Sequence, residues 1–133
     1  MDCVVFDTEA LLAYYFGEPG GDAVLQLLDD ICGGRLRGCI SVVNLAELYY
    51  IIHRRSPKLA DEKVRNLRAF GVEVVGVDPK QHLWEEAAVI KSLSSLSLGD
   101  AFAAATAKAC GGKLVTGGDP EFERAGVTLL KIR

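Results

Sequence analysis

The chain contains 133 residues and has a mass of 14.3 kDa, the size of one domain that buries a hydrophobic core without disulfides. Hydrophobic residues make up 50% of the sequence and charged residues 25%, a balance that excludes a collagen, a coiled coil and a disordered tail. The 18 Asp and Glu outnumber the 15 Lys and Arg, so a protein that coats nucleic acid with a basic surface is disfavoured. A nucleic-acid site built on a metal ion stays open, because the metal supplies positive charge.

Short apolar runs predict strands, and apolar residues at helical spacing predict helices. In chain order, the first half contains a strand at 3–6, helices at 8–16 and 22–31, a strand at 39–40, and helices at 42–55 and 56–70. The second half contains a strand at 72–77, helices at 78–93 and 97–110, a strand at 114–115, a helical turn from 119 and a strand at 127–132. Helices alternate throughout with strands that are apolar on both faces. This pattern predicts one α/β domain over residues 1–133, with a parallel sheet that helices cover on both faces.

The N-terminus, MDCVVFD, lacks the basic start and apolar stretch of a signal peptide, and no apolar run reaches the roughly 18 residues of a membrane helix. The four cysteines are Cys3, Cys32, Cys39 and Cys110. None forms a C-x-x-C pair, so we interpret them as small buried hydrophobic residues in a reducing cytoplasm rather than as zinc ligands. We therefore expect a cytoplasmic protein that does not enter a membrane.

Four acidic residues fall where predicted strands end or helices begin: Asp7, Glu47, Asp100 and Asp119. In a parallel sheet the carboxyl ends of the strands meet at one edge, where ligands bind. Each aspartate also has an ordinary structural explanation. Asp7 suits a helix N-cap, Ser97 and Asp100 fit a capping box, and Asp119-Pro120 is a common helix start.

Glu47 lies in SVVNLAELYYII, a segment that is apolar almost all round and should therefore be largely buried. A buried carboxylate needs a partner, which is either Arg54 or Arg55 or a metal ion shared with the other three acids. Two like charges about 4 Å apart cost on the order of 4 kcal/mol at a dielectric near 20, so four converging carboxylates need a cation. An all-oxygen site favours Mg²⁺ or Mn²⁺ over zinc, and His53 and His82 are expected to be surface or structural.

The four acids stand in VVFDT, SVVNLAE, SLGDA and VTGGDPEF, and together these motifs resemble the PIN domain, in particular the stand-alone VapC-type toxins. The resemblance covers nearly the whole chain. It implies a three-layer α/β/α fold with a central parallel sheet of about five strands. It implies a Mg²⁺- or Mn²⁺-dependent endoribonuclease that leaves a 5′-phosphate and a 3′-hydroxyl, with Asp7, Glu47, Asp100 and Asp119 as metal ligands and catalytic residues.

The same resemblance assigns Thr116 to the family's threonine near the last acid and Thr8 to the hydroxyl residue after the first. Two departures stand out. Gly117 and Gly118 both separate Thr116 from Asp119, where the family usually has one residue, and Glu9 replaces a small polar residue.

The resemblance also implies a homodimer and a groove for an antitoxin. Tyr is favoured at interfaces, and two tyrosine-containing clusters, at 14–16 and 49–50, are consistent with such surfaces. The basic stretch around Arg54, Arg55 and Lys58 is either a solvated helix end or a contact for the RNA backbone.

The main alternative function is a catalytically weak PIN-like module that binds RNA or protein. A phosphotransferase with Asp7 as nucleophile is disfavoured by Glu9, and a dinucleotide-binding protein is excluded because no G-x-G-x-x-G follows the first strand.

Overall fold

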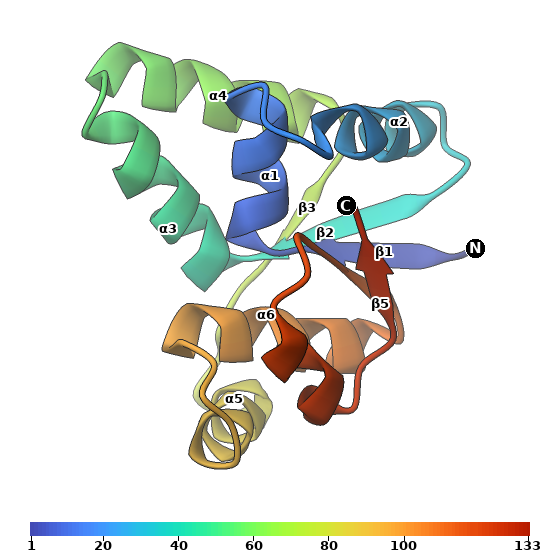
Figure 1. The fold of residues 1–133 in the computed structure, drawn as a ribbon, viewed down its shortest axis with the longest axis vertical. Coiled ribbons are helices and arrows are strands. Elements are labelled where there is room, and N and C mark those ends of the chain that lie inside the picture. Colours follow the sequence, from blue (N-terminus) through green and yellow to red (C-terminus); the bar gives the residue numbers. More distant parts are fainter.

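A computed structural model describes the whole chain, residues 1–133, and Figure 1 shows its fold. The strands are β1 (Cys3–Phe6), β2 (Arg37–Ser41), β3 (Glu73–Val75), β4 (Lys113–Thr116) and β5 (Leu129–Lys131). The helices are α1 (Thr8–Tyr15), α2 (Gly21–Cys32), α3 (Val42–His53), α4 (Pro57–Ala69), α5 (Leu83–Ser92), α6 (Leu98–Cys110) and the 3-10 helix η1 (Pro120–Ala125).

The five strands form one sheet in the order β3-β2-β1-β4-β5, and every neighbouring pair is parallel. Helices α1 to α4 lie on one side of the sheet, and α5, α6 and η1 lie on the other (Figure 1). The predicted three-layer fold with a parallel sheet of five strands is therefore confirmed.

The central strand β1 serves two hydrophobic cores because successive side chains of a strand point to opposite faces. Val4 and Phe6 join the core under α1 to α4, and Cys3 and Val5 join the core under α5 and α6. All four positions of β1 are buried, which explains why its sequence is a continuous apolar run.

The chain reverses direction across the sheet at β1. It moves outward from β1 to β2 and β3, then returns past α5 and α6 to place β4 and β5 on the other side of β1. In open parallel sheets this reversal leaves a crevice beyond the carboxyl ends of the two strands that flank it, which here are β1 and β4. Residues that follow β1 and β4 therefore occupy the usual ligand-binding position.

One predicted helix start is wrong. The Asp78-Pro79 pair does not begin α5, which starts at Leu83 with His82 as its N-cap. The Asp78 carboxylate instead accepts a hydrogen bond from the Lys80 N–H at 2.8 Å, which closes a local turn before the helix. An aspartate followed by proline suits a turn and a helix start equally, so the sequence does not separate the two.

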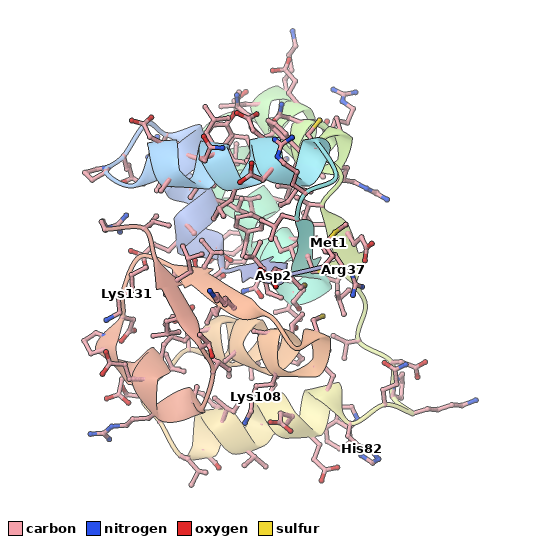
Figure 2. The ribbon with its side chains drawn as sticks, turned by 90° about the vertical axis from the view of Figure 1, so that its right-hand side faces the viewer. Met1, Asp2, Arg37, His82, Lys108 and Lys131 are labelled. Atoms are coloured by element: carbon pink, nitrogen blue, oxygen red, sulfur yellow. The ribbon has the colours of Figure 1, made fainter.

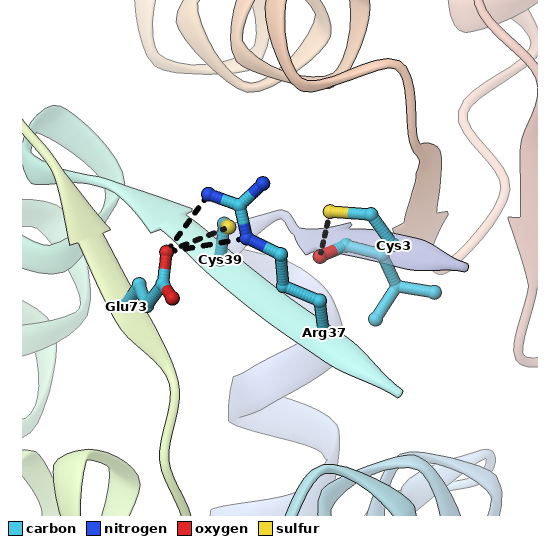
Figure 3. Close-up of polar contacts among 5 residues, drawn as sticks. Cys3, Arg37, Cys39 and Glu73 are labelled. Atoms are coloured by element: carbon cyan, nitrogen blue, oxygen red, sulfur yellow. Dashed lines mark hydrogen bonds and ion pairs between the residues drawn. The ribbon is translucent and has the colours of Figure 1, made fainter. Parts of the chain in front are cut away.

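The cysteines differ from the expectation in one case, because Cys32 is exposed while Cys3 and Cys39 are buried and Cys110 is intermediate. Figure 3 shows Cys39 on β2, where its thiol donates to Glu73 at 3.9 Å and Arg37 also bonds Glu73. Burial raises the pKa of the Cys39 thiol to about 12. A thiol that stays protonated is a structural group, in agreement with the sequence interpretation.

Figure 2 shows Met1, Asp2 and Arg37 together at the amino ends of β1 and β2, whereas Asp7 follows the carboxyl end of β1. The Arg37 N–H bonds the Asp2 carbonyl at 2.9 Å there. No helix of the structure is both long enough and apolar enough to span a membrane.

Candidate active site

Asp7 is the most deeply buried acid at the carboxyl edge of the sheet, with 1% of its surface exposed. It follows β1 directly and caps α1, because Oδ1 accepts the Ala10 N–H at 2.7 Å. Its second oxygen, Oδ2, is also buried but has no hydrogen-bond partner. A buried carboxylate oxygen without a partner costs free energy. The helix cap explains the position of Oδ1 but gives no reason for burying Oδ2.

The environment of Asp7 favours its neutral form. The pKa of the carboxyl is raised to about 7, mainly by burial, and the negative charges of Asp100 and Glu9 act in the same direction. The nearby Thr116 hydroxyl and the Ala10 N–H oppose this shift. A positive ion beside Oδ2 would reverse the balance by favouring the charged form.

Asp100 lies in the first turn of α6, where its N–H bonds the hydroxyl of the N-cap Ser97 at 3.1 Å. Burial raises the pKa of the Asp100 carboxyl, the Ser97 hydroxyl lowers it, and the charges of Glu47 and of Asp119 raise it again. The charge of Glu9 acts in the same direction. Asp100 therefore lies within electrostatic reach of the other predicted acids, while its N–H forms one of the two contacts of the predicted capping box.

Glu47 is half-buried on α3 and does not pair with arginine, so that interpretation of its burial is wrong. Arg54 instead lies 4.8 Å from the centre of the Tyr50 ring, and Arg55 lies 3.9 Å from that of Phe16. The partner of Glu47 is the Thr8 hydroxyl, which donates to Oε1. This hydrogen bond joins α3 to the start of α1, directly beside Asp7.

Asn44 is a site residue that sequence reasoning missed. Its side chain is fully buried, and Nδ2 donates to the Gly99 carbonyl at 3.0 Å and to the Thr8 hydroxyl at 3.4 Å. Since Thr8 donates in turn to Glu47, Asn44 connects the helices that carry Asp7, Glu47 and Asp100. The available signal was an asparagine three residues before Glu47, on the same face of an apolar helix.

Gly99 allows the Glu47 carboxylate to approach α6 closely, because a Cβ at this position would force the carboxylate to shift by a few tenths of an ångström. A Cβ at position 99 would lie 3.0 Å from Oε2 and 3.2 Å from Oε1 of Glu47. The glycine therefore lets the Glu47 carboxylate lie against the first turn of α6, next to Asp100.

The doubled glycine leaves Asp119 within electrostatic reach of Asp100. Gly118 adopts a positive φ of 106°, and its N–H bonds the Thr116 hydroxyl at 3.3 Å. Asp119 then caps η1 by accepting the Glu121 N–H at 2.9 Å, and its charge raises the pKa of Asp100. Gly118 is suited to this turn because residues with a Cβ rarely adopt such a φ.

The donors at this edge match the chemistry of a hard divalent cation. All of them are oxygens, neither His nor Cys is among them, and Oδ2 of Asp7 is buried without a partner. No three of the acids are yet arranged as a closed set of metal ligands. The residues therefore fit Mg²⁺ or Mn²⁺ by donor type and charge, with side-chain adjustment needed to surround an ion.

The fold and the site together describe a parallel α/β protein with carboxylates gathered at a topological switch point. A sequence comparison with protein families matches residues 4–127 to the PIN domain. The chain therefore belongs to the PIN domain family. No curated protein sequence matches it.

Solved structures of toxin–antitoxin proteins share the fold. DNA-bound VapBC from Salmonella typhimurium matches with a TM-score of 0.75 and 20% identity, over 100% of both chains. VapBC2 from Rickettsia felis, bound to a promoter DNA fragment, has a TM-score of 0.73 and 19% identity over 97% of both chains. VapC20 from Mycobacterium tuberculosis, a sarcin–ricin loop cleaving toxin, has a TM-score of 0.70 and 19% identity over 96% of this chain and 98% of its own.

Proposed function

We propose that this chain is a Mg²⁺- or Mn²⁺-dependent endoribonuclease and the toxin of a toxin–antitoxin pair. The observation that carries the proposal is the buried, unpartnered Oδ2 of Asp7, surrounded by the charges of other acids at the switch point. Buried carboxylates that repel one another lower the stability of the protein, and a bound cation offsets that cost, whereas binding of RNA alone does not. Membership of the PIN family and the shared fold with VapC20, which cleaves the sarcin–ricin loop, support an RNA substrate.

Asp7 and Asp100 are assigned as the main metal ligands, with Glu47 and Asp119 completing or orienting the shell. A bound divalent ion supplies charge stabilisation at the phosphorus and an acidified water for in-line attack. Thr8 fixes Glu47 through the hydrogen bond to Oε1, and Asn44 fixes Thr8, so this carboxylate is held in place before substrate binds.

Glu47 and Asp119 are the candidates that orient the attacking water or accept its proton. Asp119 is restrained because it accepts the Glu121 N–H, and the Thr116 side chain is close enough to Asp7 to lower the pKa of that carboxyl. The Thr116 hydroxyl accepts the Gly118 N–H, so its own proton is free to be donated to a carboxylate or a phosphate oxygen.

The test is cleavage of single-stranded RNA by the wild type and by Asp100→Asn, each with Mn²⁺ and with EDTA. We expect the wild type to cleave only with Mn²⁺ and Asp100→Asn to lose at least about a hundredfold in rate, the cost of removing one charge-stabilising group. Asp29→Asn is the control, because Asp29 is exposed near the far end of α2. Equal rates for Asp100→Asn and the wild type would exclude this site.

The alternative function is a catalytically weak PIN-like module that binds RNA or protein. The observation in its favour is that no three acids form a ready-made set of metal ligands. RNA binding by the wild type without any cleavage in Mn²⁺ would support this module over the nuclease.

The proposal includes a homodimer and an antitoxin partner. Exposed apolar side chains on and after α5, including Trp84, Val89 and Leu93 with 75% of its surface exposed, support protein contacts. Two of the structures that share the fold are described as VapBC proteins. Size-exclusion chromatography with light scattering at micromolar concentration tests the dimer, and a strict monomer would contradict it. Co-purification with the product of a neighbouring reading frame tests the antitoxin.

A further inference from the structure

Glu9 and Arg133 form an ion pair at the rim of the acidic site. The Arg133 guanidinium contacts Glu9 through one terminal nitrogen, and the other donates to the Pro19 carbonyl at 2.9 Å. The two side chains come from opposite ends of the sequence, so no local pattern indicates the pair. It lies beside the candidate metal site because the charge of Glu9 raises the pKa of both Asp7 and Asp100.

The sheet places Arg133 at this edge. Strand β5 runs parallel to β4, with Lys131 opposite Thr116, and the Ile132 N–H bonds the Thr116 carbonyl at 3.0 Å. Thr116 is the last residue of β4 and belongs to the site. The residue that follows Ile132 therefore extends past the end of β4, on the side where the acids gather.

Gly117 leaves the room that this pair occupies. A Cβ at position 117 would lie 2.5 Å from Oε1 of Glu9 and 2.8 Å from a terminal nitrogen of Arg133. Any other residue would displace the pair or move the turn. The two departures from the family pattern, Glu9 and the doubled glycine, thus meet at one place with Arg133.

Arg133 is also the only cation that is ion-paired with an acid of this region, since the other ion pairs lie elsewhere on the surface. Its guanidinium has five N–H groups, of which two are engaged, and 37% of the side chain is exposed. A planar guanidinium with free donors matches the oxygens of a phosphate. RNA, which must approach a strongly acidic site, gains most from a cation at that point.

We propose that Arg133 binds a phosphate of the RNA next to the one being cleaved, and that Glu9 holds the guanidinium in position. This inference rests on the proposed ribonuclease function and adds a substrate-binding residue to it. It also explains Gly117, which keeps the space between Glu9 and Arg133 open.

The experiment measures binding of a fluorescent single-stranded RNA in EDTA, by anisotropy, between 25 and 200 mM NaCl. We expect Arg133→Gln to weaken binding about tenfold at low salt, as for loss of one charged hydrogen bond, and to reduce the salt slope by about 0.7. Arg133→Lys should restore the slope, because the charge returns. Glu9→Gln should weaken binding less than Arg133→Gln does and should leave the salt slope unchanged, because the cation remains while the carboxylate that positions it is lost.

The matched control is Lys131→Gln. Lys131, labelled in Figure 2, lies two residues before Arg133 and pairs with Glu123 at 3.1 Å on a similarly exposed surface. If Arg133→Gln and Lys131→Gln have equal effects, the effect is one of general charge and the proposal is overturned. The proposal is also overturned if the wild type does not bind RNA. Should the wild type bind RNA with the expected pattern but fail to cleave it in Mn²⁺, the nuclease function is lost while the phosphate contact stands.

Discussion

Replacing Asp7 by Asn should stabilise the metal-free protein, although it removes a residue of the proposed active site. The Asp7 carboxyl is buried, its Oδ2 has no partner, and burial raises its pKa from 3.8 to about 7. Asparagine has the same shape and caps a helix as well as aspartate does, so the bond to the Ala10 N–H is retained. The substitution therefore removes a buried charge with little other change.

The sign of the pH dependence follows from the raised pKa. The folded state holds the Asp7 proton more tightly than the unfolded state, so this group contributes most to stability at low pH. That contribution falls as pH rises from about 4 through 7. With a pKa of 3.8 in the unfolded chain and about 7 in the folded protein, ionisation of Asp7 lowers the free energy of unfolding by about 1.7 kcal/mol at pH 5 and about 4 kcal/mol at pH 8. The advantage of Asp7→Asn should therefore grow by about 2.5 kcal/mol between pH 5 and pH 8.

The assay is urea unfolding of both proteins in EDTA at pH 5, 6, 7 and 8. Comparing the two proteins at each pH cancels the groups that titrate alike in both and any fixed effect of the new amide. Asp29→Asn serves as the control, since Asp29 is exposed, and should change stability by less than about 1 kcal/mol without a step in this range. A difference between Asp7→Asn and the wild type that stays constant from pH 5 to pH 8 would refute the reasoning.

Two further substitutions test how the site is held. Gly99→Ala should weaken Mn²⁺ binding about tenfold by displacing Glu47, while the stability of the helix is unchanged or improved by up to about 1 kcal/mol. Calorimetry measures the Mn²⁺ affinity and thermal unfolding measures the stability. An unchanged affinity would contradict the close contact between Gly99 and the Glu47 carboxylate. Asn44→Ala should cost about 1–3 kcal/mol of stability and also weaken Mn²⁺ binding about tenfold, because Thr8 loses its donor. Thr106→Ala, which removes a buried hydroxyl bonded within α6, should lose stability but keep its Mn²⁺ affinity, and an equal loss of affinity in both variants would refute a specific role for Asn44.

The fold was predictable because its signals are local. The strand at 3–6 is apolar at every position, and the structure buries all of them between two layers of helices. Helix ends were predictable where a side chain caps the helix, as at Ser41 and Ser56. The start of α5 was not, because Asp78 and Pro79 form a turn from residues that also begin helices.

The four acids were candidates from the sequence because parallel strands bring their carboxyl ends to one edge. Their hydrogen-bond partners were not predictable, because hydrogen bonds between distant segments leave no spacing in the sequence. The Thr8 hydroxyl bonds Glu47 across 39 residues, and Arg133 pairs with Glu9 across 124. The arginines Arg54 and Arg55, one of the two partners that the sequence offered for Glu47, were candidates for the same reason, since only neighbours within one helix can be inferred from periodicity.

The most direct test of the central claim is the position of Mn²⁺ in crystals of the wild-type protein, located by anomalous diffraction. The proposed site predicts a peak at the carboxyl edge of the sheet, bonded to Oδ2 of Asp7 and to the Asp100 carboxylate, with Glu47 and Asp119 around it. Crystals that bind Mn²⁺ only elsewhere, or that leave Oδ2 of Asp7 without a ligand at saturating Mn²⁺, would contradict it.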